Sequence, residues 1–281
     1  MKEISSKDNR IFKQAASLQD KKHRDALGMY LIEGPSFIRD AVRYGGRLRF
    51  IFIRAGSAEA LSDLEDLSEA SGGPAVYSLT DELFSRLSST EHSRGAVAAA
   101  EKRVMSADGF FAAGEAAREA SGASGASAAR GNVLVLDRIQ DPGNLGTMIR
   151  TAEAMGFSGV MLIKGCADPY APKTVRACAG SILRMPLFFA ESGAEAAELL
   201  RSRGKRLYAA RMDGETACMD ADLRENAAVI IGNEGSGVSE ELARASEGLM
   251  IPMAGSIESL NAGLAAGMIM YESLRQSLSG K

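Results

Sequence analysis

The chain has 281 residues, 46% hydrophobic and 25% charged, which is the composition of a soluble globular protein with one large domain or two modest ones. Its longest apolar runs, such as 227–232, are far shorter than the ~20 residues of a membrane span. The charged start, MKEISSKDNR, contains no secretory signal, and three cysteines without CxxC spacing suit a reducing cytoplasm. Only two histidines are present, so we expect no metal site.

Charge is distributed unevenly along the chain. The net charge of −3 argues against a simple cationic nucleic-acid binder, yet residues 1–54 carry 12 Lys and Arg against 6 Asp and Glu. Residues 55–104 carry 4 against 9. A basic leading segment suits local contact with phosphates, although such runs more often cover a solvated helix face. Charge alone therefore leaves nucleic-acid binding open.

The first part of the chain alternates between helical and strand-like segments, which predicts a small α/β domain. The expected helices are 9–26, 35–44, 58–71 and 81–88, and the expected strands are 30–33, 48–53, 75–78 and 95–101. An Ala-, Gly- and Ser-rich stretch follows at 106–131, with a flexible-linker composition in its second half. We expect domains at 1–105 and 132–281, joined by a linker at 106–131 in which 112–120 can form a short helix.

The second part alternates more strictly. The expected strands are 132–139, 159–164, 185–189, 206–212, 227–232 and 249–253, and the expected helices are 145–155, 172–181, 194–203, 238–245 and 259–277. Near-continuous apolar strands separated by helices predict a mostly parallel sheet with helices on both faces. Ligands of such sheets bind beyond the carboxyl ends of the strands.

Several common motifs are absent from these strand ends. The first strand of the second domain leads into DRIQDPGNLGTMIR and not into GxGxxG, so a Rossmann dinucleotide site is excluded. The sequence has no GxxxxGK[ST] and no GxSxG, and neither histidine lies in this domain. A P-loop nucleoside triphosphatase and a Ser-His-Asp hydrolase are therefore excluded as well.

Three strand ends carry unusual polar loops. The first contains Asn144, placed to cap the next helix, and is followed by Arg150 among apolar neighbours. The second is GNEGSG at 232–237, whose three glycines permit close approach of backbone to a ligand. The third runs from Ile251 to Asn261, and Ser259 there can simply cap the last helix. Each loop is a weak signal when taken alone.

Together the loops carry a specific resemblance. The segments DPGNLGTMIRTAEAMGFSGVMLI, IIGNEGSGVS and IPMAGSIESLNAGLAAGMIMYE resemble the three signature motifs of the SpoU (TrmH-like) RNA ribose 2′-O-methyltransferases, across nearly all of 132–277. The first domain resembles the substrate-binding extension of that family more loosely, through GMYLIEG at 28–34 and EHSRG at 91–95.

The resemblance implies an α/β fold whose C-terminal part, from about residue 227, forms a trefoil knot that holds S-adenosylmethionine. The residues matching the cofactor-binding positions are Gly232, Ile251, Met253, Ser259 and Leu260. Those matching the polar catalytic set are Asn144, Arg150, Glu234, Ser259 and Asn261. Family members are homodimers, so Arg150 is expected to act beside the cofactor of the partner. Guanidinium is effectively always protonated, which leaves the identity of the general base open.

Two departures from the family pattern are small. Cys178 stands where a serine is common, and Gly263 stands in the last helix where a larger residue is expected. Neither change removes a catalytic polar group, so we expect an active enzyme acting on ribosomal RNA. The expected RNA contacts are Lys13, Lys21, Lys22, Arg24 and Arg94. The alternatives are a tRNA methyltransferase, a non-catalytic RNA-binding homologue, and, against its loop motifs, a methyltransferase acting on a base or small molecule.

Overall fold

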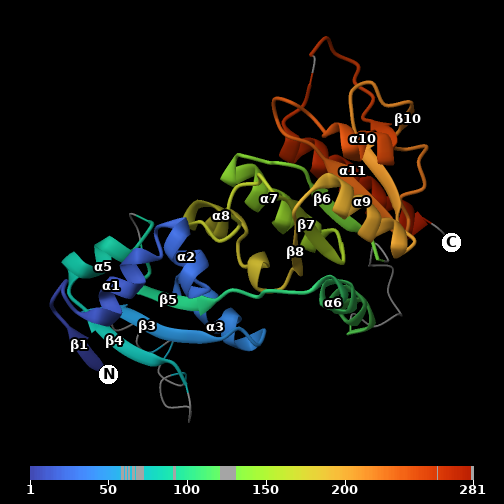
Figure 1. The fold of residues 1–281 in the computed structure, drawn as a ribbon. Helices are drawn as coiled ribbons and strands as arrows, with labels where there is room; N and C mark the ends of the chain where they lie inside the picture. Colours follow the sequence, from blue (N-terminus) through green and yellow to red (C-terminus); the bar gives the residue numbers. More distant parts are fainter. Residues whose placement is uncertain are drawn as a thin grey trace. The chain divides into compact units, whose positions relative to one another are not determined.

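The computed structural model describes residues 1–281 except 58–59, 61, 63, 65–66, 68–72, 91–92, 121–130, 258 and 280–281, and omits the side chains of 117–120. The predicted helix at 58–71 and the second half of the predicted linker fall largely outside the described residues. The chain forms two compact units (Figure 1). The first comprises 1–103 with 168–176, and the second comprises 104–167 with 177–281.

The first unit is built on a mixed five-stranded sheet of order β1-β4-β3-β5-β2, with β5 antiparallel to both neighbours. Its strands are β1 (Lys2–Ile4), β2 (Met29–Glu33), β3 (Leu48–Arg54), β4 (Ala75–Leu79) and β5 (Ala96–Glu101). Its helices include α1 (Arg10–Ser17), α2 (Lys21–Leu27), α3 (Pro35–Arg43) and α5 (Asp81–Leu87). Phe12 of α1 and Phe84 of α5 share one hydrophobic core with Phe52 of β3.

The predicted helix 9–26 is two helices. Asn9 caps α1 by accepting from the Ile11 amide at 2.9 Å, and Asp20 caps α2 by accepting from the Lys22 amide at 3.0 Å. A carboxylate at Asp20 satisfies an amide that a continuous helix would pair with a carbonyl, so the chain turns before α2 begins. Gly28, with φ of 63°, ends α2.

Residues 168–176 lie within the first unit although their neighbours in sequence lie in the second. The anchor is Arg24, which is 3% exposed. Its guanidinium donates to Asp168 at 2.7 and 2.9 Å and to the Leu18 and Gln19 carbonyls at 2.8 Å. Tyr170 packs against Tyr30, with ring centroids 4.8 Å apart. Arg24, an expected RNA contact, is thus engaged in the interior.

The second unit contains a seven-stranded, wholly parallel sheet of order β10-β12-β9-β11-β6-β7-β8. The strands are β6 (Val133–Leu136), β7 (Gly159–Ile163), β8 (Leu187–Ala190), β9 (Arg206–Ala210), β10 (Thr216–Ala217), β11 (Ala227–Ile231) and β12 (Glu247–Met250). The helices are α6 (Ala107–Ala120), α7 (Pro142–Ala154), α8 (Pro172–Ala177, mostly in the first unit), η1 (Ser181–Leu183), α9 (Gly193–Ser202), α10 (Glu240–Ala245) and α11 (Ala262–Ser279). The predicted parallel sheet is confirmed.

Helices cover both faces of this sheet (Figure 1). On one face α6, α9 and α10 share a core with alternate residues of β6, β7, β9 and β11. The intervening strand residues point to the opposite face, where α7 and α11 pack against each other. Six strands were predicted, and the additional one, β10, is a two-residue edge strand too short to leave a sequence pattern.

Helix α6 belongs to the second unit and occupies the first half of the stretch that composition marks as a linker. Phe110 is 1% exposed and lies in the same core as Val133 and Phe188. A methyl group on Gly159 would lie 2.4 Å from the Phe110 ring, so this glycine makes room for the aromatic side chain. The two adjacent phenylalanines, and not the surrounding alanines, anchor the helix.

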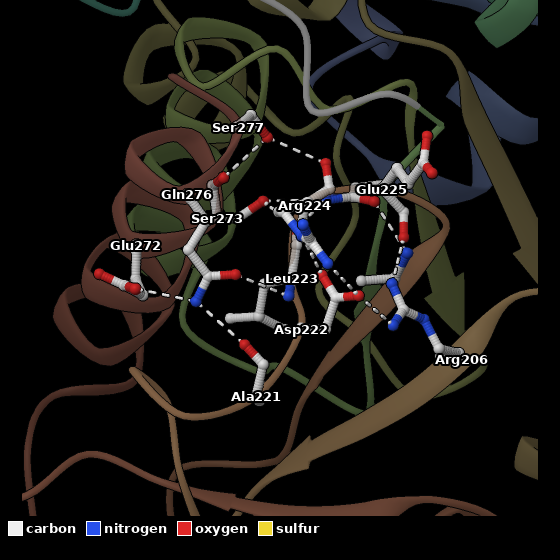
Figure 2. Close-up of polar contacts among 12 residues, drawn as sticks. Arg206, Ala221, Asp222, Leu223, Arg224, Glu225, Glu272, Ser273, Gln276 and Ser277 are labelled. Atoms are coloured by element: carbon white, nitrogen blue, oxygen red, sulfur yellow. Dashed lines mark hydrogen bonds and ion pairs between the residues drawn. The ribbon is translucent and has the colours of Figure 1, made fainter. Parts of the chain in front are cut away.

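A set of polar contacts fastens the loop before β11 to α11 (Figure 2). Ser273 and Asn132 are fully buried, and both donate to the Leu223 carbonyl, at 2.9 and 2.8 Å. Gln276 accepts from the Leu223 amide at 2.9 Å and donates to the Ala221 carbonyl at 3.0 Å. Because both polar groups of the Leu223 backbone are satisfied by side chains, the irregular loop is held against the helix without a strand partner.

Candidate active site

A pocket of about 780 Å³ opens beyond the carboxyl ends of β9, β11 and β12 in the second unit. This is the edge at which ligands bind to parallel sheets, and the volume lies in the range of small-molecule sites. All five predicted cofactor-binding residues line the pocket: Gly232, Ile251, Met253, Ser259 and Leu260. These residues come from two loops, one after β11 and one after β12, and the fold brings them to one cavity.

The loop 232–237 is fixed by its own hydrogen bonds. Asn233 Oδ1 accepts from the Gly235 amide at 3.0 Å and from the Ser236 amide at 2.9 Å, and its Nδ2 donates to the Arg138 carbonyl at 2.9 Å. A methyl group on Gly232 would lie 2.2 Å from the Val238 amide nitrogen. The loop therefore folds tightly over Gly232, and only glycine fits there.

Three of the predicted catalytic side chains form a hydrogen-bonded chain beside the pocket. Asn144 Nδ2 donates to Glu234 Oε1 at 3.1 Å, and Asn144 Oδ1 accepts from Asn261 Nδ2 at 3.2 Å. These residues come from α7, the loop after β11 and the start of α11. The chain consequently links one wall of the pocket, through Glu234 and Asn261, to the first turn of α7.

The caps of α7 and α11 differ from the expected ones. Asp141 caps α7 by accepting from the Asn144 amide at 2.7 Å, and Asn261 Oδ1 accepts from the Leu264 amide at 3.1 Å at the start of α11. The side chain of Asn144 is therefore not used as a cap, and Ser259 lies before the helix in the pocket wall. Both ends of the Asn144 amide are available for the chain with Glu234 and Asn261.

Glu234 is held as a carboxylate. Partial burial alone would raise its pKa, but the hydrogen bond from Asn144 and those from the backbone amides of Gln140 and Asp141 outweigh burial and lower the pKa. The amide contacts measure 3.3 and 3.4 Å. A carboxylate with a lowered pKa is a poor proton acceptor at neutral pH, so this environment suits a residue that orients Asn144.

Gly263 lies against the hydrogen-bonded side chains of Asn144 and Asn261. A methyl group at this position would lie 3.2 Å from Asn261 Oδ1 and 3.3 Å from Asn144 Oδ1. The glycine that departs from the expected family pattern thus leaves the two amides room to meet.

Arg150 lies apart from the hydrogen-bonded side chains of Asn144, Glu234 and Asn261. Its side chain is exposed on α7, does not line the pocket, and makes no hydrogen bond or ion pair with the residues that the structure describes. Its helix packs against α11, whose outward side carries Leu264, Met268, Tyr271 and Leu278, each between 42% and 59% exposed. This row of apolar side chains on α11 is therefore open to solvent in the single chain.

The predicted RNA contacts other than Arg24 lie on the surface of the first unit. Lys13 pairs with Asp8, and Lys21 pairs with Asp25, both at 2.7 Å. Lys22 and Arg94 are exposed and form no ion pair with a carboxylate of the described residues. His92 and part of the EHSRG motif fall outside the described residues.

The pocket also includes residues that motif reasoning missed. Arg211, Met212 and Asp213 follow β9 and line the pocket, and Arg211 binds Asp213 at 2.7 and 2.9 Å. Their position just after a buried strand was an available signal. Burial raises the pKa of the Cys166 thiol to about 11 and that of Cys178 to about 12, so neither is a thiolate nucleophile at neutral pH.

The residues that the structure describes contain no cluster of three or more His, Cys, Asp or Glu side chains with the geometry of a metal site. None of the helices found there has the length and apolarity that a membrane crossing requires.

Comparison with known families matches both parts of the chain. Residues 131–271 match the SpoU rRNA Methylase family, and residues 9–98 match the MRM3-like substrate binding domain. The chain is 30% identical over 275 residues to the 23S rRNA (guanosine(2553)-2′-O)-methyltransferase RlmP of Bacillus subtilis, covering 96% of this chain and 98% of that protein.

Solved structures agree over nearly the whole length. The SpoU methyltransferase AviRb from Streptomyces viridochromogenes superposes with a TM-score of 0.82 at 26% identity, covering 97% of this chain and 99% of that one. The AdoMet-bound rRNA methyltransferase from Sinorhizobium meliloti gives 0.80 at 28% identity, with 98% of each chain covered.

Proposed function

The chain belongs to the SpoU rRNA methylase family, and from that premise we propose that it transfers the methyl group of S-adenosylmethionine to a ribose 2′-hydroxyl of ribosomal RNA. The observation that carries the proposal is the pocket bordered by the Glu234–Asn144–Asn261 chain. The full-length relative RlmP is a 23S rRNA enzyme, which favours rRNA over the tRNA alternative.

The pocket suits S-adenosylmethionine in size and in lining. The loops around Gly232, Ile251 and Leu260 offer backbone groups and apolar side chains, and Ser259 and Asn261 add polar ones. When bound, S-adenosylmethionine supplies an electrophilic sulfonium methyl group, for which a covalent enzyme nucleophile is not required. Loops that are already fixed, such as 232–237, would hold such a ligand with little ordering cost.

The polar chain supports positioning rather than proton abstraction. Glu234, with its lowered pKa, holds the Asn144 amide, and Asn144 in turn holds Asn261. In this arrangement Asn144 orients the ribose whose 2′-hydroxyl attacks. Alignment of attacking oxygen, methyl and sulfur accounts for much of the expected acceleration.

Arg150 is proposed to complete the site from the partner of a homodimer. Its exposure, and the row of apolar side chains on the neighbouring helix α11, support an interface formed by α7 and α11. A protonated guanidinium there would clamp the phosphate next to the target ribose and stabilise the developing alkoxide charge.

Two further features are part of the proposal. The segment from about residue 227 to the C-terminus, which supplies most of the pocket, forms a trefoil knot, supported by the likeness to SpoU structures over 97% of the chain. A cytoplasmic location is supported by the free state of all three cysteines and by a ribosomal substrate.

The direct test is transfer of labelled methyl groups from S-adenosylmethionine into unmodified rRNA and tRNA. We expect label in rRNA, recovered as alkali-resistant dinucleotides because a 2′-O-methyl group blocks hydrolysis. The Arg150→Ala variant should bind the cofactor normally, by calorimetry, and lose at least about a hundredfold in transfer. Label in tRNA alone would show that the substrate is tRNA and not rRNA. Cofactor binding without label in any RNA or ribosomal particle would overturn the proposed activity.

A further inference from the structure

An exposed tyrosine and two arginines lie in the turn from α3 to β3, and a third arginine contacts this turn. The turn consists of Arg43, Tyr44, Gly45, Gly46 and Arg47, and Arg103 lies against it; we call these six residues the basic turn. Arg103 Nη2 donates to the Tyr44 carbonyl, and a methyl group on Gly45 would lie 3.8 Å from the same nitrogen. Two segments far apart in sequence therefore bring their cations to one surface.

The two glycines produce the sharp reversal that exposes Tyr44. Gly45 has φ of 70°, and the Gly46 amide donates to the Ala41 carbonyl at 2.7 Å, closing the helix end. A methyl group on Gly46 would lie 2.7 Å from that same oxygen. The backbone leaves the helix so abruptly that the Tyr44 side chain is 39% exposed.

The guanidinium groups of the basic turn have no acidic partner among the residues that the structure describes. No ion pair joins Arg43, Arg47 or Arg103 to a carboxylate within the described part of the chain. Lys13 and Lys21, by contrast, already contact carboxylates at 2.7 Å. A phosphate can bind at the basic turn without displacing an acidic side chain, which it cannot do at Lys13 or Lys21.

Arg43 also stacks near the tyrosine, with its guanidinium carbon 5.7 Å from the centre of the Tyr44 ring. The favourable position of a cation at a helix C-terminus explains Arg43 by itself. It does not explain Arg47 and Arg103, which lie outside the helix. Aromatic rings and guanidinium planes are the surfaces on which unpaired bases stack, and arginines hold the adjoining phosphates.

We infer that the basic turn binds an unpaired RNA segment, with one base stacked on Tyr44 and Arg43 and the flanking phosphates held by Arg47 and Arg103. This inference rests on the proposed function in taking RNA as the ligand. It places an RNA contact at a position different from the helices α1 and α2 that charge distribution alone suggested.

The test is binding of a fluorescent single-stranded oligouridylate to the full-length protein, measured by anisotropy at several salt concentrations. The double variant Arg43→Ala/Arg47→Ala should bind at least about tenfold more weakly. Its slope of log affinity against log salt should fall by about 0.7, because Arg47 is the one phosphate contact that the variant removes. Tyr44→Ala should lose about tenfold, whereas Tyr44→Phe keeps the ring and the affinity.

Arg86→Ala is the matched control, because Arg86 is an exposed arginine of the same unit that is already paired with Glu82 at 3.1 Å. Wild-type affinity and salt slope in the double variant would overturn the inference. A loss seen only with a duplex probe, or an equal loss in Tyr44→Phe, would overturn the stacking. Methyl transfer by the wild-type protein is measured separately, so failure of the proposed function is distinguished from failure of this contact.

Discussion

Because Gly263 has no side chain, it leaves space for the amide groups of Asn144 and Asn261 to meet. Replacing it with alanine should stabilise α11 by about 1 kcal/mol through helix propensity. The new methyl group, however, would lie 3.2 and 3.3 Å from the amide oxygens of Asn261 and Asn144 and would push them apart. We expect methyl transfer to fall at least severalfold while the melting temperature holds or rises.

Gly267→Ala is the matched control for that substitution. It lies in the same helix, and its methyl group would meet Thr151 Cγ2 at an ordinary 4.0 Å. If Gly263→Ala and Gly267→Ala have equal activity, spacing of the two amides does not matter for transfer.

The lowered pKa of Glu234 predicts how the stability of the protein depends on pH. Its pKa lies below the ordinary value of about 4.3, because hydrogen bonds from Asn144 and two backbone amides outweigh its burial. A carboxyl group with a lowered folded-state pKa stabilises the protein above the unfolded-state value and loses that effect as pH falls through the lowered one. The difference in melting temperature between wild type and Glu234→Gln should therefore stay constant from neutral pH to about pH 5.

Below about pH 4 the same difference should shrink, because protonation of Glu234 makes the wild type resemble the variant. A difference that instead changes steadily between about pH 5 and pH 7 would show that the pKa of Glu234 in the folded protein is raised toward neutrality. In that case it would be the base of the reaction and not the residue that orients Asn144.

At the scale of the secondary-structure elements, the buried Arg24 side chain joins two segments of the first unit. It ties α2 to the segment 168–176, with both side chains of the Arg24–Asp168 pair less than 10% exposed. Arg24→Ala would leave the buried Asp168 carboxylate without its cationic partner, and we expect a loss of about 3–5 kcal/mol in the free energy of unfolding, measured in urea. Lys21→Ala, at an exposed pair, should cost at most about 0.5 kcal/mol.

Equal effects of those two substitutions would mean that the buried pair is solvated in solution. A practical consequence follows for RNA binding. Neutralising Lys21, Lys22 and Arg24 together would confound lost RNA contacts with lost structure, so Arg24 must be left intact in that experiment.

The contact between the loop 221–225 and α11 gives the second prediction at this scale (Figure 2). Asn132 donates to Leu223 and to Ser273, and its oxygen accepts from the Ala227 amide at 2.8 Å. Asn132→Ala leaves the buried Ala227 amide without its hydrogen-bond acceptor, which should lower the free energy of unfolding, measured in urea, by about 2 kcal/mol. Arg275→Ala on the exposed side of the helix is the control and should change stability by less than about 0.5 kcal/mol; a comparable loss there would refute a specific role for Asn132.

The elements also show which features a sequence can reveal. Strands buried on both faces, such as β6 and β11, are predictable because every residue is apolar. The composition predicts only a short helix at 112–120 within a linker, whereas α6 begins at Ala107, because alanines outnumber its two buried phenylalanines. Asn144, Glu234 and Asn261 could be selected by their motifs, but the chain of hydrogen bonds that joins them, and the role of Gly263 beside it, depend on atomic distances.

At the scale of the whole molecule, the proposed homodimer predicts that two inactive variants restore each other. Arg150→Ala keeps the pocket and Asn144 but lacks the arginine, whereas Asn144→Ala keeps the arginine and lacks the amide. If Arg150 acts in the partner's site, a heterodimer of the two contains one complete site and one that lacks both groups. Differently tagged chains, co-expressed and purified through both tags, should then transfer methyl groups at about half the wild-type rate per dimer.

Each variant alone should remain nearly inactive, which sets the baseline for the mixture. If Arg150 served the site of its own chain, both sites of the heterodimer would lack one group, and the purified heterodimer would be no more active than either parent. Tyr271→Asp provides the complementary test, because a charge in the apolar row of α11 should convert the dimer to monomer by light scattering. A monomer that retained full activity would exclude action between subunits, since Arg150 would then have no partner site to enter.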